Sequence, residues 1–479
     1  MKKFLCLIAL SAVFASCKKA ELDLQPFNQI ETASAFTTQT DVTLAINGMY
    51  NGLRTNANAN ANSYVNGTWN IIADVMADNV IVSSLGRQSL TFFGDWRYNA
   101  DNTFNFFQTG YTIIRRANAI LENIEAFPAG AFKDNTKGEA LAIRAMVYLD
   151  MVRTYSKTFE NASATDSTMA YITTTDAKIL PSKESVKGFY NKVISDLTTA
   201  LPLIGANNGV GRFNKTVVSG LLSRAYLYTG DFANCITAAN AALGTTPVLP
   251  NIADFPKIWT DDTNNGVLFK VLNTVLDNVN TQGVNYFQIV GGLIKSEYVV
   301  EYNLNKKYLS NDVRTSSYIQ TSLFNGVLQN HIVKYRSRSG AGVAGVVDAK
   351  VLRTAEVLLN RAEAYQRSGS DLNALADLNL LKANRYTGFI NIVGLAGPAL
   401  LAEILAERRL ELAFESDRFW DLKRRNQPVV RDPNFGDRAD GTGVKYIFTN
   451  LAAGDYRFQL PYPSTEVNFN KAFTQNPGY

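Results

Sequence analysis

The sequence contains a single histidine, His331, and only three cysteines among its 479 residues. Histidine is the usual acid–base group near neutral pH and a common metal ligand, so metal sites built on paired histidines are excluded. A Ser–His–Asp triad could use only His331, and no G-x-S-x-G turn occurs in the chain. These absences predict a protein that is not an enzyme, in which His331 is a structural or surface residue.

The three cysteines do not form a disulfide framework, because each lies in a different context. Cys6 lies in an apolar run over residues 4–14, which follows two lysines. The run has about eleven residues, too few to span a bilayer, and it predicts a signal peptide over residues 1–16. Cys17 follows two small residues, an ending that resembles a lipobox, in which Cys17 receives lipid and becomes the mature N-terminus. An ordinary signal peptide with an incidental cysteine is the alternative, and Cys235 remains alone.

Positive charge is slight and dispersed. The net charge is +5, and no basic run interleaved with aromatics occurs, so nucleic acid is not an expected partner. No stretch after the signal is apolar enough to cross a membrane. We therefore expect the lipid on Cys17 to be the membrane anchor.

A helical motif with the pattern R-A-x-x-Y occurs at residues 144–148, 224–228 and 361–365. In each copy a leucine precedes the alanine by four positions, so Leu, Ala and Tyr share one helical face. Gly230 and Gly369 follow the second and third copies, where a left-handed helix end is typical, and a second amphipathic helix follows each glycine. Small Ala against large Tyr, then a turn and a partner helix, is typical of tetratricopeptide hairpins. The sequence therefore predicts a mainly α fold with an irregular, tetratricopeptide-like scaffold of helical hairpins.

The segments between the hairpins differ in composition from the hairpins themselves. Residues 55–67 are rich in Asn and Ala and predict an exposed loop, and residues 82–102 lack a helical period. Residues 261–292 mix Asn and Gly with β-branched runs, which favours short strands or loops. From residue 432 onward Pro, Gly and aromatics are frequent, and we expect no helix there. The scaffold is thus predicted to carry loop-rich insertions and few short strands.

The longest distinctive motif is A-E-R-R-L-E-L-A-F-E-S-D-R-F-W-D-L-K-R at residues 406–424. Other motifs accompany it in order along the chain: L-D at 22–23, K-Y at 334–335, R-T-A-E-V-L-L at 353–359, A-E-A-Y at 362–365, L-P-Y-P at 460–463 with Glu466, and Q-N-P-G-Y at 475–479. Together with Cys17 they resemble the SusD/RagB family, the starch-utilisation-type lipoproteins of Gram-negative surfaces. The resemblance runs essentially from end to end.

This resemblance implies an α-helical fold with four helical hairpins, in one unit over residues 17–479. Its N-terminal half would cover residues 17–210 and its C-terminal half residues 211–479. The resemblance also implies a lipid-anchored protein exposed on the outer membrane. Its expected partner is a TonB-dependent outer-membrane transporter (SusC-like), over which such a protein sits as a hinged lid.

Glu411 and Glu415 invite an enzymatic interpretation, because paired carboxylates can do acid–base work. Both lie on one face of a predicted helix with Arg408 and Arg418, at spacings of three, four and three residues. Two glutamates four apart repel unless cations intervene. We therefore expect an Arg–Glu–Glu–Arg ladder with a structural role.

Two further patterns suggest cofactors but lack the required context. The loop at residues 340–345 spells G-x-G-x-x-G, but no apolar strand precedes it, as a dinucleotide site requires. Asp261 and Asp262 offer oxygen ligands without the spacing of a calcium loop, so a structural calcium stays open as an alternative but is not supported by a motif. We expect no cofactor.

A sugar ring presents an apolar face and a rim of hydroxyls, which suits flat aromatics accompanied by Asn, Asp, Gln or Arg. Such side chains gather in the irregular segments. Trp96 is the strongest candidate, because Gly94, Asp95 and Arg97 surround it. The full set of predicted ligand-binding residues is Tyr64, Trp69, Arg87, Asp95, Trp96, Tyr98, Asn99 and Tyr286.

The leading prediction is a glycan-binding lipoprotein that captures oligo- or polysaccharide and delivers it to the transporter. A protein of the same fold that captures peptides or another nutrient remains open, because stacking aromatics also bind peptides. A surface hydrolase is a further alternative, but the sequence contains no identifiable set of catalytic residues for it. A hairpin scaffold for protein assembly would not need the polar aromatic insertions.

Overall fold

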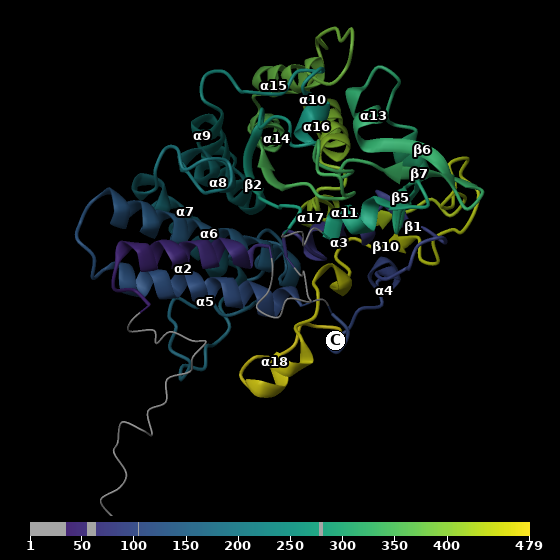
Figure 1. Ribbon diagram of the computed structural model, residues 1–479. Coiled ribbons are helices and arrows are strands. Elements are labelled where there is room, and N and C mark those ends of the chain that lie inside the picture. The colour runs from purple at the N-terminus through teal and green to yellow at the C-terminus, as the bar shows by residue number, and fades with distance from the viewer. Residues whose placement is uncertain (1–34, 55–63, 104, 277–280) are drawn as a thin grey trace, which may run out of the picture.

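The computed structural model describes residues 35–54, 64–103, 105–276 and 281–479 (Figure 1). The predicted signal peptide and Cys17 lie outside these residues, as does most of the predicted loop at 55–67. Helices dominate, which confirms the mainly α prediction. The helices are α2 Gln39–Gly52, α3 Trp69–Val75, α4 Thr91–Gly94, α5 Phe106–Ile124, α6 Ala131–Tyr155, α7 Val186–Leu203, α8 Lys215–Thr229, α9 Phe232–Leu243, α10 Phe255–Ile258, α11 Thr281–Tyr286, α12 Tyr302–Asn305, α13 Val313–Tyr318, α14 Thr354–Arg367, α15 Asp371–Ala383, α16 Gly397–Glu411, α17 Arg418–Arg424 and α18 Ser464–Phe469.

Neighbouring helices pack in pairs, as the repeated motif predicts. α5 packs on α6, α6 on α7, α8 on α9, and α14 on both α9 and α15 (Figure 1). α8 ends at Thr229 and is capped by Gly230, whose φ of 72° is left-handed. The Asp231 side chain then accepts a hydrogen bond from the N–H of Asn234 at the start of α9. A residue without Cβ adopts this backbone at little cost, so α9 can fold back on α8.

The arginine of each motif copy joins its helix to a neighbour. Arg144 in α6 makes two hydrogen bonds to Asp196 in α7, at 2.7 and 2.8 Å. Arg224 in α8 binds Glu356 in α14 at 2.6 and 2.8 Å. Arg361 in α14 binds Asp377 in α15 at 2.8 and 2.7 Å. These paired bonds fix the register between helices, because the planar guanidinium matches a carboxylate in one orientation.

Strands are short and lie mainly in the insertions. The strands are β1 Val80–Val82, β2 Val267–Val271, β3 Gln288–Val290, β4 Leu293–Lys295, β5 Tyr298–Val300, β6 Ile319–Phe324, β7 Val327–Ile332, β8 Ala349–Arg353, β9 Val429–Val430 and β10 Asn450–Leu451. The largest sheet has the antiparallel order β1-β5-β7-β6, with Val80 opposite Val300. β1 comes from the N-terminal half and its neighbours from the C-terminal half, so this sheet connects the two.

Three expectations about irregular segments are wrong in part. Residues 82–102 contain the short helix α4, and residues 261–292 contain α11. The tail after residue 432 contains α18 and a 3₁₀ turn, Tyr456–Phe458, where no helix was expected. Helices this short show too few turns for a hydrophobic period to be visible in the sequence.

The main hydrophobic core draws on both halves of the chain, from Val42 in α2 to Phe473 near the end. A second core lies under the largest sheet and includes Trp259, Tyr286 and Tyr318. No helix among the described residues has the length and apolarity needed to cross a bilayer.

Candidate ligand-binding site

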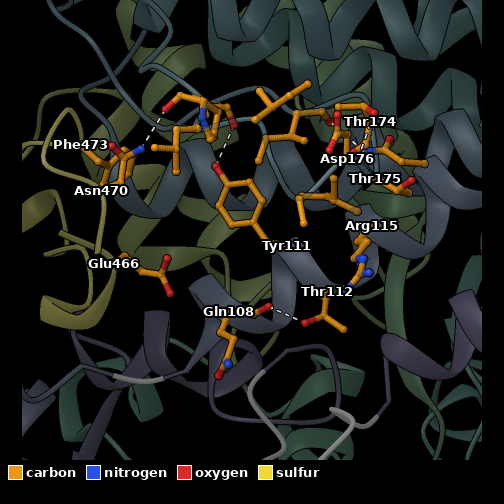
Figure 2. Close-up of a pocket in the computed structure, with 18 of the residues that line it drawn as sticks. Gln108, Tyr111, Thr112, Arg115, Thr174, Thr175, Asp176, Glu466, Asn470 and Phe473 are labelled. Carbon is orange, nitrogen blue, oxygen red and sulfur yellow. Dashed lines mark hydrogen bonds between the residues drawn. The ribbon is translucent and has the colours of Figure 1, made fainter. Parts of the chain in front are cut away.

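A groove of about 410 Å³ lies between α5, the segment 170–181 and α18, and is called here the α5–α18 groove (Figure 2). Phe107, Tyr111, Ile172 and Phe473 contribute much of its apolar lining. Its polar groups come from Gln108, Thr112, Arg115, Asn118, Thr174, Thr175, Asp176, Glu466 and Asn470. An apolar lining with a few polar groups at the rim is typical of small-ligand sites.

The walls of the groove are tied together by side chains. The hydroxyl of Tyr111 donates to the carbonyl of Ala170 at 2.7 Å, which fixes the segment 170–181 on α5 (Figure 2). Nδ2 of Asn470 donates to the carbonyl of Pro181 at 3.1 Å, and this bond attaches the end of α18 to the same segment. The groove is therefore formed before any ligand arrives, which lowers the entropic cost of binding.

The rim of the groove carries exposed apolar side chains. Phe469 on α18 is 81% exposed, Leu180 is 66% exposed and Ile179 is 54% exposed. Beneath them the Phe107 ring lies 5.0 Å from the Tyr111 ring and 5.9 Å from the Phe473 ring. An aromatic ring as open as Phe469 loses contact with water on binding, so it can contribute to affinity.

The groove contains one partly buried charge. Burial raises the pKa of Glu466 above its ordinary value. Burial also raises the pKa of Tyr111 well above its ordinary value, with smaller contributions from neighbours that include Glu466. The Tyr111 hydroxyl therefore stays protonated and acts as a hydrogen-bond donor.

A larger, open cavity of about 600 Å³ runs along α16 and α17. Most of its charges are already paired. Arg418 makes hydrogen bonds of 2.7 and 2.9 Å to Asp78, and Lys382 binds Glu403 and Glu407. Few of the polar groups in this cavity are free to bind a ligand. The α5–α18 groove is therefore the better candidate for the ligand-binding site.

The aromatic residues predicted to bind ligand are core residues, so the expectation of open stacking faces there is wrong. Trp96 is 3% exposed, its Nε1 donates to the carbonyl of Met76 at 2.8 Å, and the Arg431 guanidinium lies 4.2 Å from its ring. The φ of Trp96 is 52°, a left-handed turn that directs the indole inward while Arg97 stays exposed.

The other predicted aromatics are equally enclosed. Tyr64 donates to Asp150 at 2.7 Å, and Trp69 Nε1 donates to Thr154 Oγ1 at 3.1 Å. The Tyr98 hydroxyl donates to the carbonyl of Arg457. Tyr286 lies in the second core, away from the others. The hydroxyls of Tyr64 and Tyr98 and the indole N–H of Trp69 each donate to a protein acceptor. These aromatic residues can therefore be buried although their neighbours in the sequence are polar.

The polar candidates are engaged locally. Arg87 binds Glu297 through Nε at 2.8 Å, Asp95 binds the guanidinium of Arg97 at 2.9 Å, and Asn99 Oδ1 accepts from the N–H of Asp101. The predicted set does not form one site, although Tyr64 and Trp69 are in contact with ring centroids 5.4 Å apart.

Glu411 and Glu415 have structural roles, but with other partners than predicted. Glu411 binds Arg353 at 2.7 Å and Arg385 at 2.9 Å, and Glu415 binds Lys334 at 2.6 Å. The predicted ladder is wrong because the motif is not one helix. α16 ends at Glu411, and Arg408 then pairs with Asp417 while Arg418 pairs with Asp78.

The remaining chemical candidates are also structural. His331 is buried in β7, where its Nδ1 lies 2.9 Å from the Ser296 hydroxyl. Asp261 is bound by Lys350 at 2.6 Å and by Arg338 at 3.2 Å, so cations of the protein occupy the oxygens that a calcium ion would need. No group of three or more His, Cys, Asp or Glu suited to a metal occurs among the described residues.

The residues of the groove were missed for an identifiable reason. Glu466 and Phe469 are three positions apart, the spacing of one helical face, but they lie in a tail where no helix was expected. Tyr111 and Phe107 lie on α5 and have the ordinary pattern of a packed helix.

The fold and the groove define a class of helical-hairpin proteins with a preformed, aromatic-lined groove at the surface. The family model described as "SusD family" matches residues 252–479, and the model described as "Starch-binding associating with outer membrane" matches residues 22–227. The chain belongs to the SusD/RagB family.

Individual relatives agree with this assignment. SusD-like protein P2 of Formosa agariphila is 25% identical over the full length of both chains. A SusD superfamily protein of Bacteroides vulgatus has a TM-score of 0.81 at 22% identity, and 93% of this chain and 100% of that one are covered. The surface glycan-binding protein A of Bacteroides thetaiotaomicron, solved with laminarihexaose, has a TM-score of 0.73 at 16% identity, with 92% and 100% covered. These structures share the fold.

Proposed function

We propose that this protein captures an oligo- or polysaccharide at the outer membrane and delivers it to a TonB-dependent transporter. The α5–α18 groove is the proposed capture site. The single observation that carries this site is the 81% exposed ring of Phe469, which stands over an aromatic-lined groove. The apolar face of a pyranose ring can cover such a ring, while rim groups receive its hydroxyls.

The membrane attachment belongs to the same proposal. Lipid on Cys17 would hold the protein on the outer membrane with the groove exposed to the medium. The family description of outer-membrane association supports this location. A transporter partner is proposed because capture at a surface benefits the cell only when the ligand is then imported.

Binding is proposed in preference to hydrolysis. A glycosidase needs two carboxyl groups free to exchange protons beside the substrate. Glu411 is buried and bound by arginines, and Glu415 is held by Lys334 and Arg353. Among the described residues that line the groove, Glu466 is the only one with a partly buried carboxyl group.

The test is a calorimetric screen of the soluble protein against neutral and acidic oligosaccharides and against mixed peptides. Phe469→Ala should weaken the best glycan about tenfold or more without changing the melting temperature. Phe448→Ala is the matched control, because this ring is 41% exposed and does not line the groove.

Two outcomes would count against the proposal. If the protein bound peptides and no glycan, its ligand would be another nutrient than a glycan. Equal glycan affinity for Phe469→Ala and the unmodified protein would remove the α5–α18 groove from the site. Incubation of the bound glycan with the protein, followed by chain-length analysis, should show no cleavage.

A further inference from the structure

Glu466 is placed in the α5–α18 groove without a protein partner. Its carboxylate points into the open space beside Tyr111 and Gln108 (Figure 2). Within the part of the chain that the structure describes, no hydrogen bond or ion pair reaches this carboxylate, and burial is the one cause that raises its pKa. A partly buried carboxylate that loses its remaining water needs donors from the ligand.

The other charges of the groove lie on the far side. Arg115 and Asp176 are both exposed and are on the opposite side of the groove from Glu466 (Figure 2). Exposed charges are screened by water and salt, so they act weakly on a bound ligand. Glu466 is therefore the charge that a ligand in the groove experiences most strongly.

Glu466 and Phe469 are positioned to contact the same part of a ligand. They are three residues apart in α18, so their side chains lie on one face of this helix. A sugar ring that covers Phe469 with its C–H face brings its hydroxyl rim toward Glu466. An ionised carboxylate has only acceptor oxygens, so adjacent sugar hydroxyls can donate to both oxygens.

We propose that Glu466 determines the ligand class, and that the groove takes neutral glycans and rejects glycans with a carboxylate or sulfate at this position. This inference rests on the proposed function. Neutral hydroxyls satisfy Glu466, whereas an anionic substituent adds like-charge repulsion where screening is reduced.

The experiment compares two ligands with the same backbone. The first is the neutral oligosaccharide that binds best in the screen, and the second is its C6-oxidised derivative, in which uronate carboxylates replace the primary alcohols. The unmodified protein should bind the neutral form at least about tenfold more tightly. Glu466→Gln keeps the size and removes the charge, so it should reduce this ratio about tenfold or more.

Glu160→Gln is the matched control, because it makes the same change at an exposed glutamate that does not line the groove, and it should leave the ratio within about twofold. Melting curves confirm that all three proteins are folded. Preferential or equal binding of the oxidised form overturns the inference, as does an unchanged ratio in Glu466→Gln, and both results leave glycan binding intact. Absence of binding by any oligosaccharide overturns the proposed function and this inference together.

Discussion

Asp74 and Ser416 are 342 residues apart in the sequence, yet Oδ2 of Asp74 accepts a hydrogen bond from the backbone N–H of Ser416 at 3.1 Å. Oδ1 of the same carboxylate accepts from the N–H of Phe414, also at 3.1 Å. Phe414 and Ser416 have φ values of 68° and 60°, which side-chain-bearing residues rarely adopt. Asp74 in α3 thus stabilises a strained loop between α16 and α17, and joins the two halves of the chain.

Asp74 should make stability depend on pH. Burial raises its pKa from 3.8 to about 6. Because the folded state then binds this proton more tightly than the unfolded chain, the free energy of unfolding falls as pH rises from about 4 to about 6. A shift of this size corresponds to a loss of about 3 kcal/mol.

The measurement is urea unfolding of the unmodified protein and of Asp74→Asn between pH 4 and 7. His331 contributes with the opposite sign, since burial lowers its pKa to about 4 and the neutral ring is favoured in the folded state. The difference between the two proteins isolates Asp74. The unmodified protein should lose about 3 kcal/mol relative to the variant over this range, and parallel curves would contradict the assignment.

Glu411→Gln should destabilise the protein strongly. Although burial opposes it, Arg385 and Arg353 hold the pKa of Glu411 well below its ordinary value. Loss of this charge leaves buried guanidinium groups without their carboxylate, at a cost of about 3 to 5 kcal/mol. Glu403→Gln is the control, because its side chain is 38% exposed in the pair with Lys382 and should cost under about 1 kcal/mol. Equal melting temperatures for the two variants would contradict this view of α16.

Local signals predicted the scaffold well. The R-A-x-x-Y copies and Gly230 depend on neighbours a few residues away, so helical periodicity and a left-handed turn were visible in the sequence. The carboxylate partners of Arg144, Arg224 and Arg361 were not visible in the sequence. Each partner lies on another helix, and the position of that helix depends on the whole fold.

The ligand site was harder to predict, because composition reports how polar a segment is and not which way a side chain turns. The exposed Arg97 pairs with the buried Asp95, while Trp96 between them turns inward. At Phe469 the reverse holds, since a large apolar residue in a short helix is left exposed. Exposure of an aromatic ring is set by tertiary packing, which these local patterns do not contain.

Cys17→Ala should release the protein from the membrane. The residue lies outside the described part of the chain, and the prediction rests on the lipobox-like sequence. A lipid anchor needs the thiol, so the variant should be soluble or retain its signal peptide, and should incorporate no radiolabelled palmitate. The experiment belongs in cells without the transporter, because a partner could retain the protein. Continued fractionation of the variant with outer membranes there would show a second anchor.

Trp96→Ala should act on stability and not on ligand affinity. The indole is enclosed in the main core, donates to Met76 and lies against Arg431, so its removal leaves a cavity and an unpaired carbonyl. Truncation of a buried aromatic costs about 3 to 5 kcal/mol. Trp96→Phe should recover part of this loss, because a ring fills the space without restoring the hydrogen bond. Urea unfolding and glycan titration of both variants separate stability from binding. A Trp96→Ala protein with an unchanged melting temperature and lost glycan binding would return Trp96 to the site and remove the case for its structural role.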